Sequence, residues 1–155
     1  MNAVQSLTTL LRHAESERDD ARGLLQQREQ QLSAASLQHQ QLLDYRRDYE
    51  QRWAGQFGQH ATMEIVQCYH GFVGRLCTAI DQQQQVVVRA QAQCEVALQK
   101  LREQELRVAS IGKLITRRMA EARLAADRRE QKATDETASR LAWARLHAAA
   151  AQLSY

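Results

Sequence analysis

The chain contains no proline in 155 residues, although proline is the residue that most often ends a helix. Only six glycines occur, and the sequence is dominated by Ala, Gln, Arg, Leu and Glu, which are strong helix formers. A β-rich domain needs turns built from proline and glycine, and an aromatic content of 5% argues against a large globular core. These features predict an all-α protein of long helices packed side by side, and they exclude all-β and doubly wound α/β folds.

One short segment interrupts the helical sequence. Gly55 and Gly58 fall within residues 54–61, and two glycines so close together indicate a turn. Thr62, followed by Glu64, is a suitable N-cap for a second helix. We therefore expect helices over about residues 3–53 and 62–150, a turn over about 54–61, and a single coiled-coil domain over 1–155.

Both predicted helices carry apolar residues at the alternating spacing of three and four that is typical of a coiled coil. In the first helix this stripe contains Val4, Leu7, Leu11, Ala14, Arg18, Ala21, Leu25, Arg28, Leu32, Ala35, His39, Leu42, Arg46, Tyr49 and Trp53. In the second it contains Val73, Leu76, Ile80, Gln83, Val87, Ala90, Cys94, Ala97, Leu101, Gln104, Val108, Ile111, Ile115, Arg118, Ala122 and Ala125. We expect the two stripes to form one seam.

An antiparallel hairpin that turns near residue 61 pairs residues whose numbers add to about 122. The apolar partners are then Leu42 with Ile80, Leu25 with Ala97, Leu11 with Ile111 and Leu7 with Ile115, and Trp53 meets Tyr69. Polar seam residues also coincide, His39 with Gln83 and Arg18 with Gln104, as expected if a buried polar group needs a partner. The sequence thus favours a two-helix antiparallel hairpin.

This register leaves the end of the second helix without a partner in the chain. The first helix is exhausted near Arg118, so residues 119–155 form an overhang that is rich in Ala, Arg and Glu. A lone helix in water is marginally stable. Two outcomes remain open for its apolar residues, such as Leu141 and Trp143: docking onto a partner, or a frayed and solvated tail.

Aromatic residues gather near the turn. Six of the eight fall between residues 45 and 72, namely Tyr45, Tyr49, Trp53, Phe57, Tyr69 and Phe72. Tyr45 and Phe72 are out of phase with the seam and should flank it, partly exposed. Aromatic residues beside a coiled coil can anchor a partner protein, although they can also simply fill the closed end.

The sequence gives no sign of catalysis, a metal site or a cofactor. Cys68, His70 and Cys77 lack the paired spacing of zinc ligands. The odd number of cysteines, Cys68, Cys77 and Cys94, suits a reducing compartment. No apolar run is long enough to span a membrane and no secretory signal is apparent, so we expect a cytoplasmic protein. The net charge is only +3, and the basic residues are interspersed with acidic ones, which disfavours nucleic-acid binding.

Three stretches resemble the flagellar export protein family FliJ: residues 7–25, residues 41–49 with the later Phe72, and residues 128–138. The most specific parts are the tyrosine pair Tyr45 and Tyr49 and the Glu-Gln-Lys…Asp-Glu element that starts at Glu130. The family often has an aromatic residue directly after that acidic pair, where this chain has Thr137; Trp143 could take its place.

The resemblance implies a non-enzymatic component of the flagellar type III export apparatus, similar to the central stalk of rotary ATPases. Its partners would be the hexameric export ATPase FliI and the cytoplasmic domain of the export-gate protein FlhA, with FliH and unloaded export chaperones as further candidates. It would be cytoplasmic and peripherally associated with the inner membrane at the flagellar base.

The resemblance also implies the binding residues. Those matching the export-gate contact are Gln38, Leu42, Tyr45, Tyr49, Phe72, Leu76, Ala79 and Gln83. Those matching the ATPase contact are Leu7, Leu10, Leu11, Arg128, Gln131, Lys132 and Asp135.

Three other readings remain open at this point. The chain could be the equivalent stalk of a virulence type III injectisome, although the Leu-Leu-Asp-Tyr…Tyr element starting at Leu42 favours the flagellar version. It could be an unrelated coiled-coil scaffold or dimerisation protein, which light scattering would reveal as a stable parallel dimer. A coiled coil that binds nucleic acid would show steep salt dependence.

Overall fold

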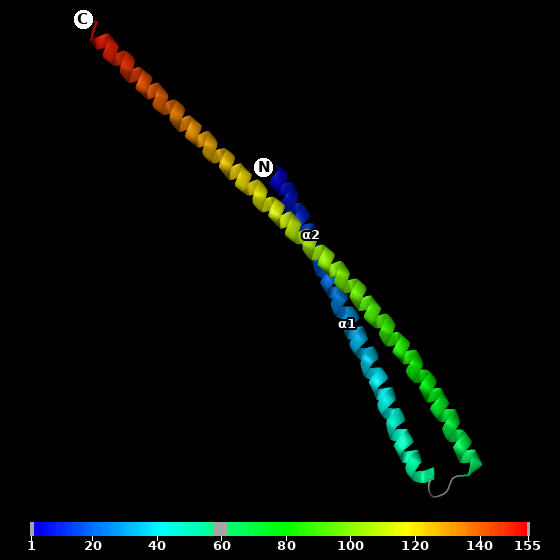
Figure 1. Ribbon diagram of the computed structural model, residues 1–155. Coiled ribbons are helices and arrows are strands. Elements are labelled where there is room, and N and C mark those ends of the chain that lie inside the picture. Colours follow the sequence, from blue (N-terminus) through cyan, green and yellow to red (C-terminus); the bar gives the residue numbers. More distant parts are fainter. Residues whose placement is uncertain (1, 58–61, 155) are drawn as a thin grey trace. The chain divides into compact units, whose positions relative to one another are not determined.

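The computed structural model describes residues 2–57 and 62–154 of the chain. This part consists of two α-helices, α1 (Asn2–Phe57) and α2 (Met63–Gln152), and contains no strand (Figure 1). The predicted all-α helical hairpin is confirmed. The chain divides into two compact units, Ala14–Arg107 and Met1–His13 with Val108–Tyr155, and each is described by itself.

The ends of the helices near the turn differ on the two sides. We expected the first helix to end near residue 53, but α1 continues through Gly55 to Phe57, because one glycine inside a helix costs only about 1 kcal/mol. Residues 58–61, which hold the rest of the expected turn, lie outside the described residues, as does Tyr155. The start of α2 is capped as predicted: the Ile65 backbone N–H donates to Thr62 Oγ1 at 3.4 Å.

Within Ala14–Arg107 the two helices pack along the predicted seam. Every residue assigned to the stripes in this unit is buried or half-buried. Half of the eight buried residues described in this unit are alanines: Ala14, Ala21, Ala35 and Ala97 are each at most 8% exposed. In the expected register Ala21, Ala35 and Ala97 lie level with larger aliphatic residues of the other helix, and this alternation keeps the helices close along the unit.

Contacts across the seam agree with the expected register. Trp53 meets Tyr69 with ring centroids 5.6 Å apart, as predicted. Two ion pairs flank the seam: Arg107 Nη1 lies 2.8 Å from Glu17 Oε2, and Arg22 Nη2 lies 3.9 Å from Glu105 Oε1. Exposed pairs of this kind contribute little stability, so the packed apolar residues hold this unit together.

The polar residues of the seam behave differently from one another. Gln83 Nε2 donates to the backbone oxygen of Ala35 at 3.0 Å, which satisfies the donor inside the seam. Gln104 is 8% exposed, and its buried Oε1 has no hydrogen-bond partner among the described residues. Arg18 also lies in the seam but does not donate to this oxygen; its guanidinium donates instead to the adjacent Asp19 carboxylate at 3.0 Å.

Two seam arginines keep their charged heads at the edge of the interface. Arg28 Nη1 donates to Gln93 Oε1 at 3.1 Å, and Arg46 Nη1 donates to Cys77 Sγ at 3.8 Å. Their aliphatic stems can cover apolar surface while the guanidinium groups remain in contact with water.

In the other unit, the first turns of α1 pack beside α2, and α2 then continues beyond the start of α1. Ile111 is 7% exposed, and Leu7, Leu11 and Ile115 are half-buried, so the apolar layers expected here are present. From residue 116 to residue 154 every described residue is exposed. The stripe residues Arg118, Ala122 and Ala125 are exposed because α1 supplies no further turns to cover them.

Neither helix of the described chain has an apolar stretch long enough to cross a membrane.

Candidate partner-binding surfaces

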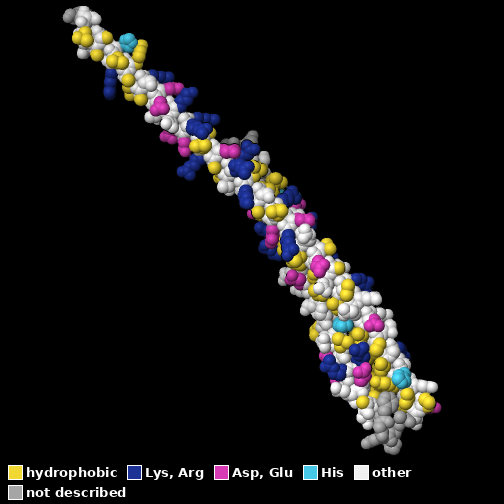
Figure 2. Space-filling view, viewed as in Figure 1, with side chains coloured by type: hydrophobic (Ala, Val, Ile, Leu, Met, Phe, Trp, Pro, Cys, Tyr) yellow, Lys and Arg dark blue, Asp and Glu magenta, His cyan; other side chains and the backbone are white. Residues whose placement is uncertain are grey.

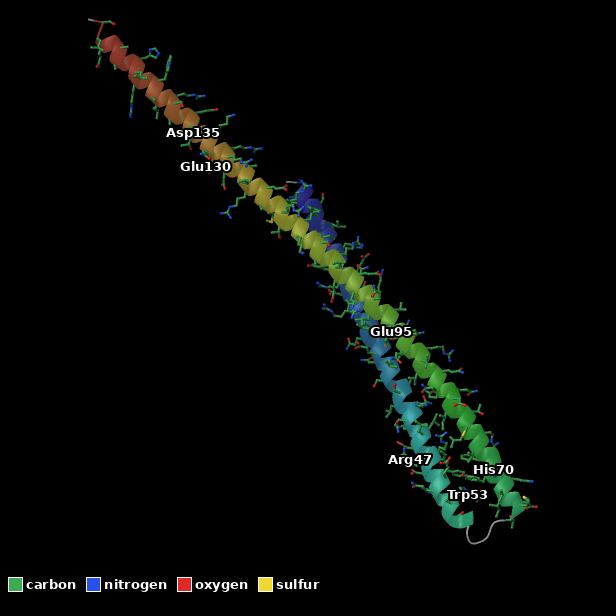
Figure 3. All side chains as sticks on the ribbon, in the orientation of Figure 1. Arg47, Trp53, His70, Glu95, Glu130 and Asp135 are labelled. Atoms are coloured by element: carbon green, nitrogen blue, oxygen red, sulfur yellow. The ribbon has the colours of Figure 1, made fainter. Side chains whose placement is uncertain are left out.

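The aromatic residues near the turn form one connected cluster within Ala14–Arg107. Tyr49 is its centre: its ring centroid lies 4.5 Å from that of Phe72, 5.6 Å from Tyr69 and 5.9 Å from Trp53. Figure 3 labels Trp53 in the last turns of α1 and His70 in the first turns of α2. Each favourable aromatic pair contributes about 0.5–1.5 kcal/mol beyond area burial, so part of this cluster closes the hairpin.

The outer edge of the same cluster faces solvent. Tyr45 is 52% exposed, and its ring stacks on Tyr49 at 6.4 Å and meets Phe72 edge-on at 6.2 Å. Phe72 is half-buried and flanks the seam, as expected from its phase. A half-exposed ring held in place by two others is a pre-organised anchor for a partner, because little side-chain entropy remains to be lost on binding.

The other residues of the expected gate contact divide between surface and seam. Gln38 is exposed, and Leu42 and Ala79 are half-buried. Leu76 is only 8% exposed, and Gln83 turns inward to Ala35. These last two residues belong to the seam phase, so they offer a partner little surface.

The residues of the expected ATPase contact lie in the other unit and fall into two groups. Leu7 and Leu11 are half-buried against α2, whereas Leu10 is 40% exposed. The second group, Arg128, Gln131, Lys132 and Asp135, is fully on the surface of the overhang. Arg128 lies 13 residues beyond Ile115, the expected partner of Leu7, which is about 20 Å along the helix. The structure therefore does not bring the two groups together.

The overhang is exposed on all sides. Figure 3 labels Glu130 and Asp135 on it, and Figure 2 shows basic and acidic side chains interspersed along this part of α2. Its large apolar residues are also solvent-facing: Leu124, Leu141, Trp143 and Leu146 are each at least 51% exposed. Trp143 meets the imidazole of His147 edge-on, with ring centroids 3.8 Å apart. A helix with this much exposed apolar surface is typical of a segment that binds a partner.

Sequence reasoning missed one surface. An apolar groove lies between α1 and α2 near Leu24, and Val96 beside it is 71% exposed. Its floor is Ala97, which the stripe identified only as a seam residue. The sequence did contain a signal for it: Val88, Val96 and Leu106 of α2 are apolar but lie out of phase with the seam. All three are exposed in the structure.

Among residues 2–57 and 62–154 no group of three or more His, Cys, Asp or Glu side chains could hold a metal ion. All three cysteines are free thiols, with Cys68 exposed and Cys77 and Cys94 half-buried. The candidate sites are the exposed surfaces described above.

Known proteins resemble this chain over nearly its whole length. The family model described as "Flagellar FliJ protein" matches residues 3–147, which include both the hairpin and most of the overhang. The flagellar FliJ protein of Salmonella typhi is 31% identical over 137 residues, a match that covers 88% of this chain and 93% of the relative. Neither match is to a family of enzymes. The chain belongs to the flagellar FliJ protein family.

Proposed function

We propose that this protein is a non-enzymatic stalk of the flagellar type III export apparatus, which binds and activates the hexameric export ATPase FliI and links it to the export gate FlhA. The observation that carries the proposal is a family match over residues 3–147 combined with a helical overhang whose described residues are exposed throughout. A helix that binds nothing in its own chain is suited to insertion into a larger assembly.

The stalk can activate an ATPase without taking part in hydrolysis. A ligand shifts a conformational equilibrium only by its difference in affinity between the states. An asymmetric helical hairpin inside a pseudo-symmetric ring contacts each subunit differently, so it stabilises one arrangement of subunit conformations over the others. The stalk must therefore bind the assembled ring more tightly than the free ATPase subunit.

In this proposal the two ends of the protein have different partners. The end that carries Leu7, Leu10, Leu11 and the overhang residues Arg128, Gln131, Lys132 and Asp135 binds the ATPase. The aromatic cluster, with Tyr45 and Phe72 outermost, binds the gate together with Gln38, Leu42, Tyr49 and Ala79. Leu76 and Gln83 match the same family contact but lie in the seam. FliH and unloaded export chaperones are further partners, and the protein acts at the cytoplasmic face of the membrane without inserting into it.

ATP hydrolysis by the purified cognate ATPase, with and without this protein, tests the first part. We expect the protein to raise the rate and the double variant Arg128→Ala/Lys132→Ala to raise it less. The matched control Arg89→Ala/Arg102→Ala removes the same charge from exposed positions in the other unit and should stimulate like the unaltered protein. No stimulation by the unaltered protein, or an equal loss in the control, would contradict the assignment.

Calorimetric titration with the cytoplasmic domain of the gate protein tests the second part. Buried aromatic anchors each contribute at least about 1–2 kcal/mol to an interface, so Tyr45→Ala/Phe72→Ala should weaken gate binding by at least about tenfold. Helicity and ATPase stimulation should remain unchanged. Leu37→Ala, at a residue that is 60% exposed and outside the aromatic cluster, is the control and should bind normally. Unchanged affinity of the double variant would remove the gate assignment.

An unrelated coiled-coil scaffold is the competing function, and light scattering at micromolar concentration separates the two. The stalk is expected to be a monomer at that concentration, whereas a scaffold forms a stable parallel dimer.

A further inference from the structure

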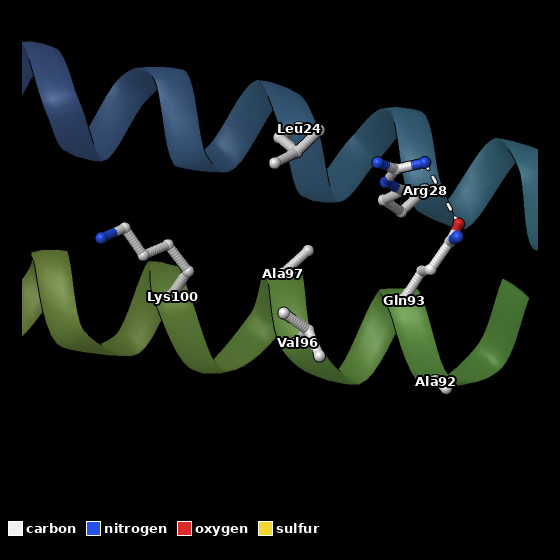
Figure 4. A pocket seen from close by; sticks show the side chains of 7 residues that line it. All are labelled: Leu24, Arg28, Ala92, Gln93, Val96, Ala97 and Lys100. Carbon is white, nitrogen blue, oxygen red and sulfur yellow. Dashed lines mark hydrogen bonds between the residues drawn. The ribbon is translucent and has the colours of Figure 1, made fainter. Parts of the chain in front are cut away.

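The groove beside Leu24 is a feature of the Ala14–Arg107 unit that the proposed function does not use. It has a volume of about 360 Å³ and is lined by Leu24, Arg28, Ala92, Gln93, Val96, Ala97 and Lys100 (Figure 4). Leu24 is 42% exposed and Val96 71% exposed, while Ala97 on the floor is 4% exposed. The small side chain of Ala97 leaves a hollow between two larger aliphatic walls.

The groove continues into two neighbouring hollows, because they share lining residues with it. One shares Ala92, Val96 and Lys100 and adds Glu95, Gln99 and Glu103. The other shares Leu24 and Lys100 and adds Glu17, Asp20, Ala21 and Gln104. The result is an apolar channel with four carboxylates along its margins.

These carboxylates outnumber the basic groups around them. Glu17 is paired with Arg107 at 2.8 Å, but Asp20, Glu95 and Glu103 form no ion pair with any described residue. The basic lining residues are Arg28, whose guanidinium already donates to Gln31 and Gln93, and Lys100. Residues 14–107 as a whole carry eleven Lys and Arg against thirteen Asp and Glu. An occupant of the groove should therefore be apolar and positively charged.

The last part of α2 has those properties. Residues 137–154 contain no Asp or Glu and include Arg140 and Arg145. Leu141, Trp143, Leu146 and Leu153 are 56%, 66%, 71% and 88% exposed. Positions 143, 146, 150 and 153 share one face of a helix, since they are spaced by three, four and three. In Figure 2 the end of α2 beyond the last acidic side chain shows hydrophobic and basic groups.

We propose that residues 137–154 of one molecule dock in the groove of a second copy, as a third helix beside α1 and α2. Trp143 and Leu146 would cover Leu24 and Val96, and Arg140 and Arg145 would approach the unpaired carboxylates of Asp20, Glu95 and Glu103. Charge complementarity favours this occupant, because the surfaces to be joined carry opposite net charge. The contact is head-to-tail, so each added molecule presents a free groove or a free segment and association can continue. It does not depend on the role proposed with the ATPase.

Sedimentation velocity of the full-length protein alone tests the proposal, in a concentration series that reaches about 1 mM so that weak contacts are detected. We expect the average mass to rise with concentration beyond that of a dimer, and to fall again in high salt because the charge contacts are screened. A mass that stays at the monomer value throughout would overturn the proposal. A dimer that does not extend would also overturn it, since it indicates a two-fold contact.

Two variants and a control sharpen the experiment. Val96→Glu blocks the groove and Leu146→Glu blocks the docking segment, and each alone should weaken association by at least about tenfold. Both positions are exposed on helices, and circular dichroism should show an unchanged helical content. Val88→Glu, at a residue that is 55% exposed and outside the groove, should associate like the unaltered protein.

An equimolar mixture of the two variants gives the decisive result. The Val96→Glu protein keeps an intact segment and the Leu146→Glu protein keeps an intact groove, so together they can form one contact. We expect the mixture to form a one-to-one complex that grows no further. A mixture that stays monomeric, or association that survives in either variant alone, would refute the docking of this segment in this groove.

Discussion

Replacing Gln104 by leucine should stabilise the hairpin by about 1–3 kcal/mol, because an unpaired buried acceptor costs about that much. The side chain is 8% exposed and its Oε1 has no hydrogen-bond partner. Leucine has a similar volume and nearly the same helix propensity, so the substitution removes the unpaired oxygen without a cavity or a helical penalty. Burial of the leucine methyl groups acts in the same direction.

Gln83→Leu is the matched control. Gln83 also lies in the seam of α2, but its Nε2 donates to the Ala35 oxygen at 3.0 Å. Loss of that hydrogen bond, about 0.5–1.5 kcal/mol, should offset most of the gain from apolar burial, so this variant should change stability little. Urea unfolding followed by far-UV circular dichroism measures both, with an unchanged m-value expected. If Gln104→Leu is destabilising, or if both variants change stability equally, the reasoning from the unpaired oxygen is wrong.

Three smaller effects should also be measurable. Gly55→Ala should stabilise α1 by up to about 1 kcal/mol in urea unfolding, because Gly55 is helical and an added Cβ meets nothing within 4 Å. A loss of stability would contradict the helical conformation of Gly55. Arg107→Ala should lower the free energy of unfolding by less than about 1 kcal/mol, and by still less in high salt, because its ion pair with Glu17 is partly exposed. A larger, salt-independent loss would mean that the pair is structurally essential. Amide hydrogens of residues 117–154 should exchange faster than those of the seam in Ala14–Arg107, as mass spectrometry can show; equal protection would mean that the overhang is covered.

Much of the fold could be predicted because both helices carry an apolar stripe and the two stripes must pack against each other. The stripe of α1 must match the stripe of α2 in phase and register, and the contact of Trp53 with Tyr69 confirms the expected alignment. The stripe on α2 continues in sequence to Ala125, and its residues from Arg118 on are exposed, as the register predicts for the part of α2 beyond the reach of α1. The end of α1 was misjudged, because a helix can absorb a single glycine such as Gly55 when nothing else opposes it.

The surfaces were less predictable than the seam. The position of Tyr45 beside Phe72 follows from helical phase and register, which the sequence contains. Arg18 does not donate to the buried oxygen of Gln104, because arginine has several acceptors within reach, and the adjacent Asp19 is one of them. The groove beside Leu24 depends on which seam residue is small enough to leave space, here Ala97, and a pattern of apolar and polar residues does not contain that information.

The most direct test is to place a photoreactive amino acid at Gln131, in the overhang, or at Tyr45, in the aromatic cluster. Each protein is then cross-linked in the presence of the cognate export ATPase and of the cytoplasmic domain of the gate protein. The account predicts that the probe at residue 131 cross-links to the ATPase under conditions that assemble the hexamer, and much less to the free subunit. The probe at residue 45 should leave the ATPase unlabelled and react with the cytoplasmic domain of the gate protein. A probe at residue 131 that labels free and assembled ATPase equally, or that labels neither, would contradict the proposal that the overhang enters the ring.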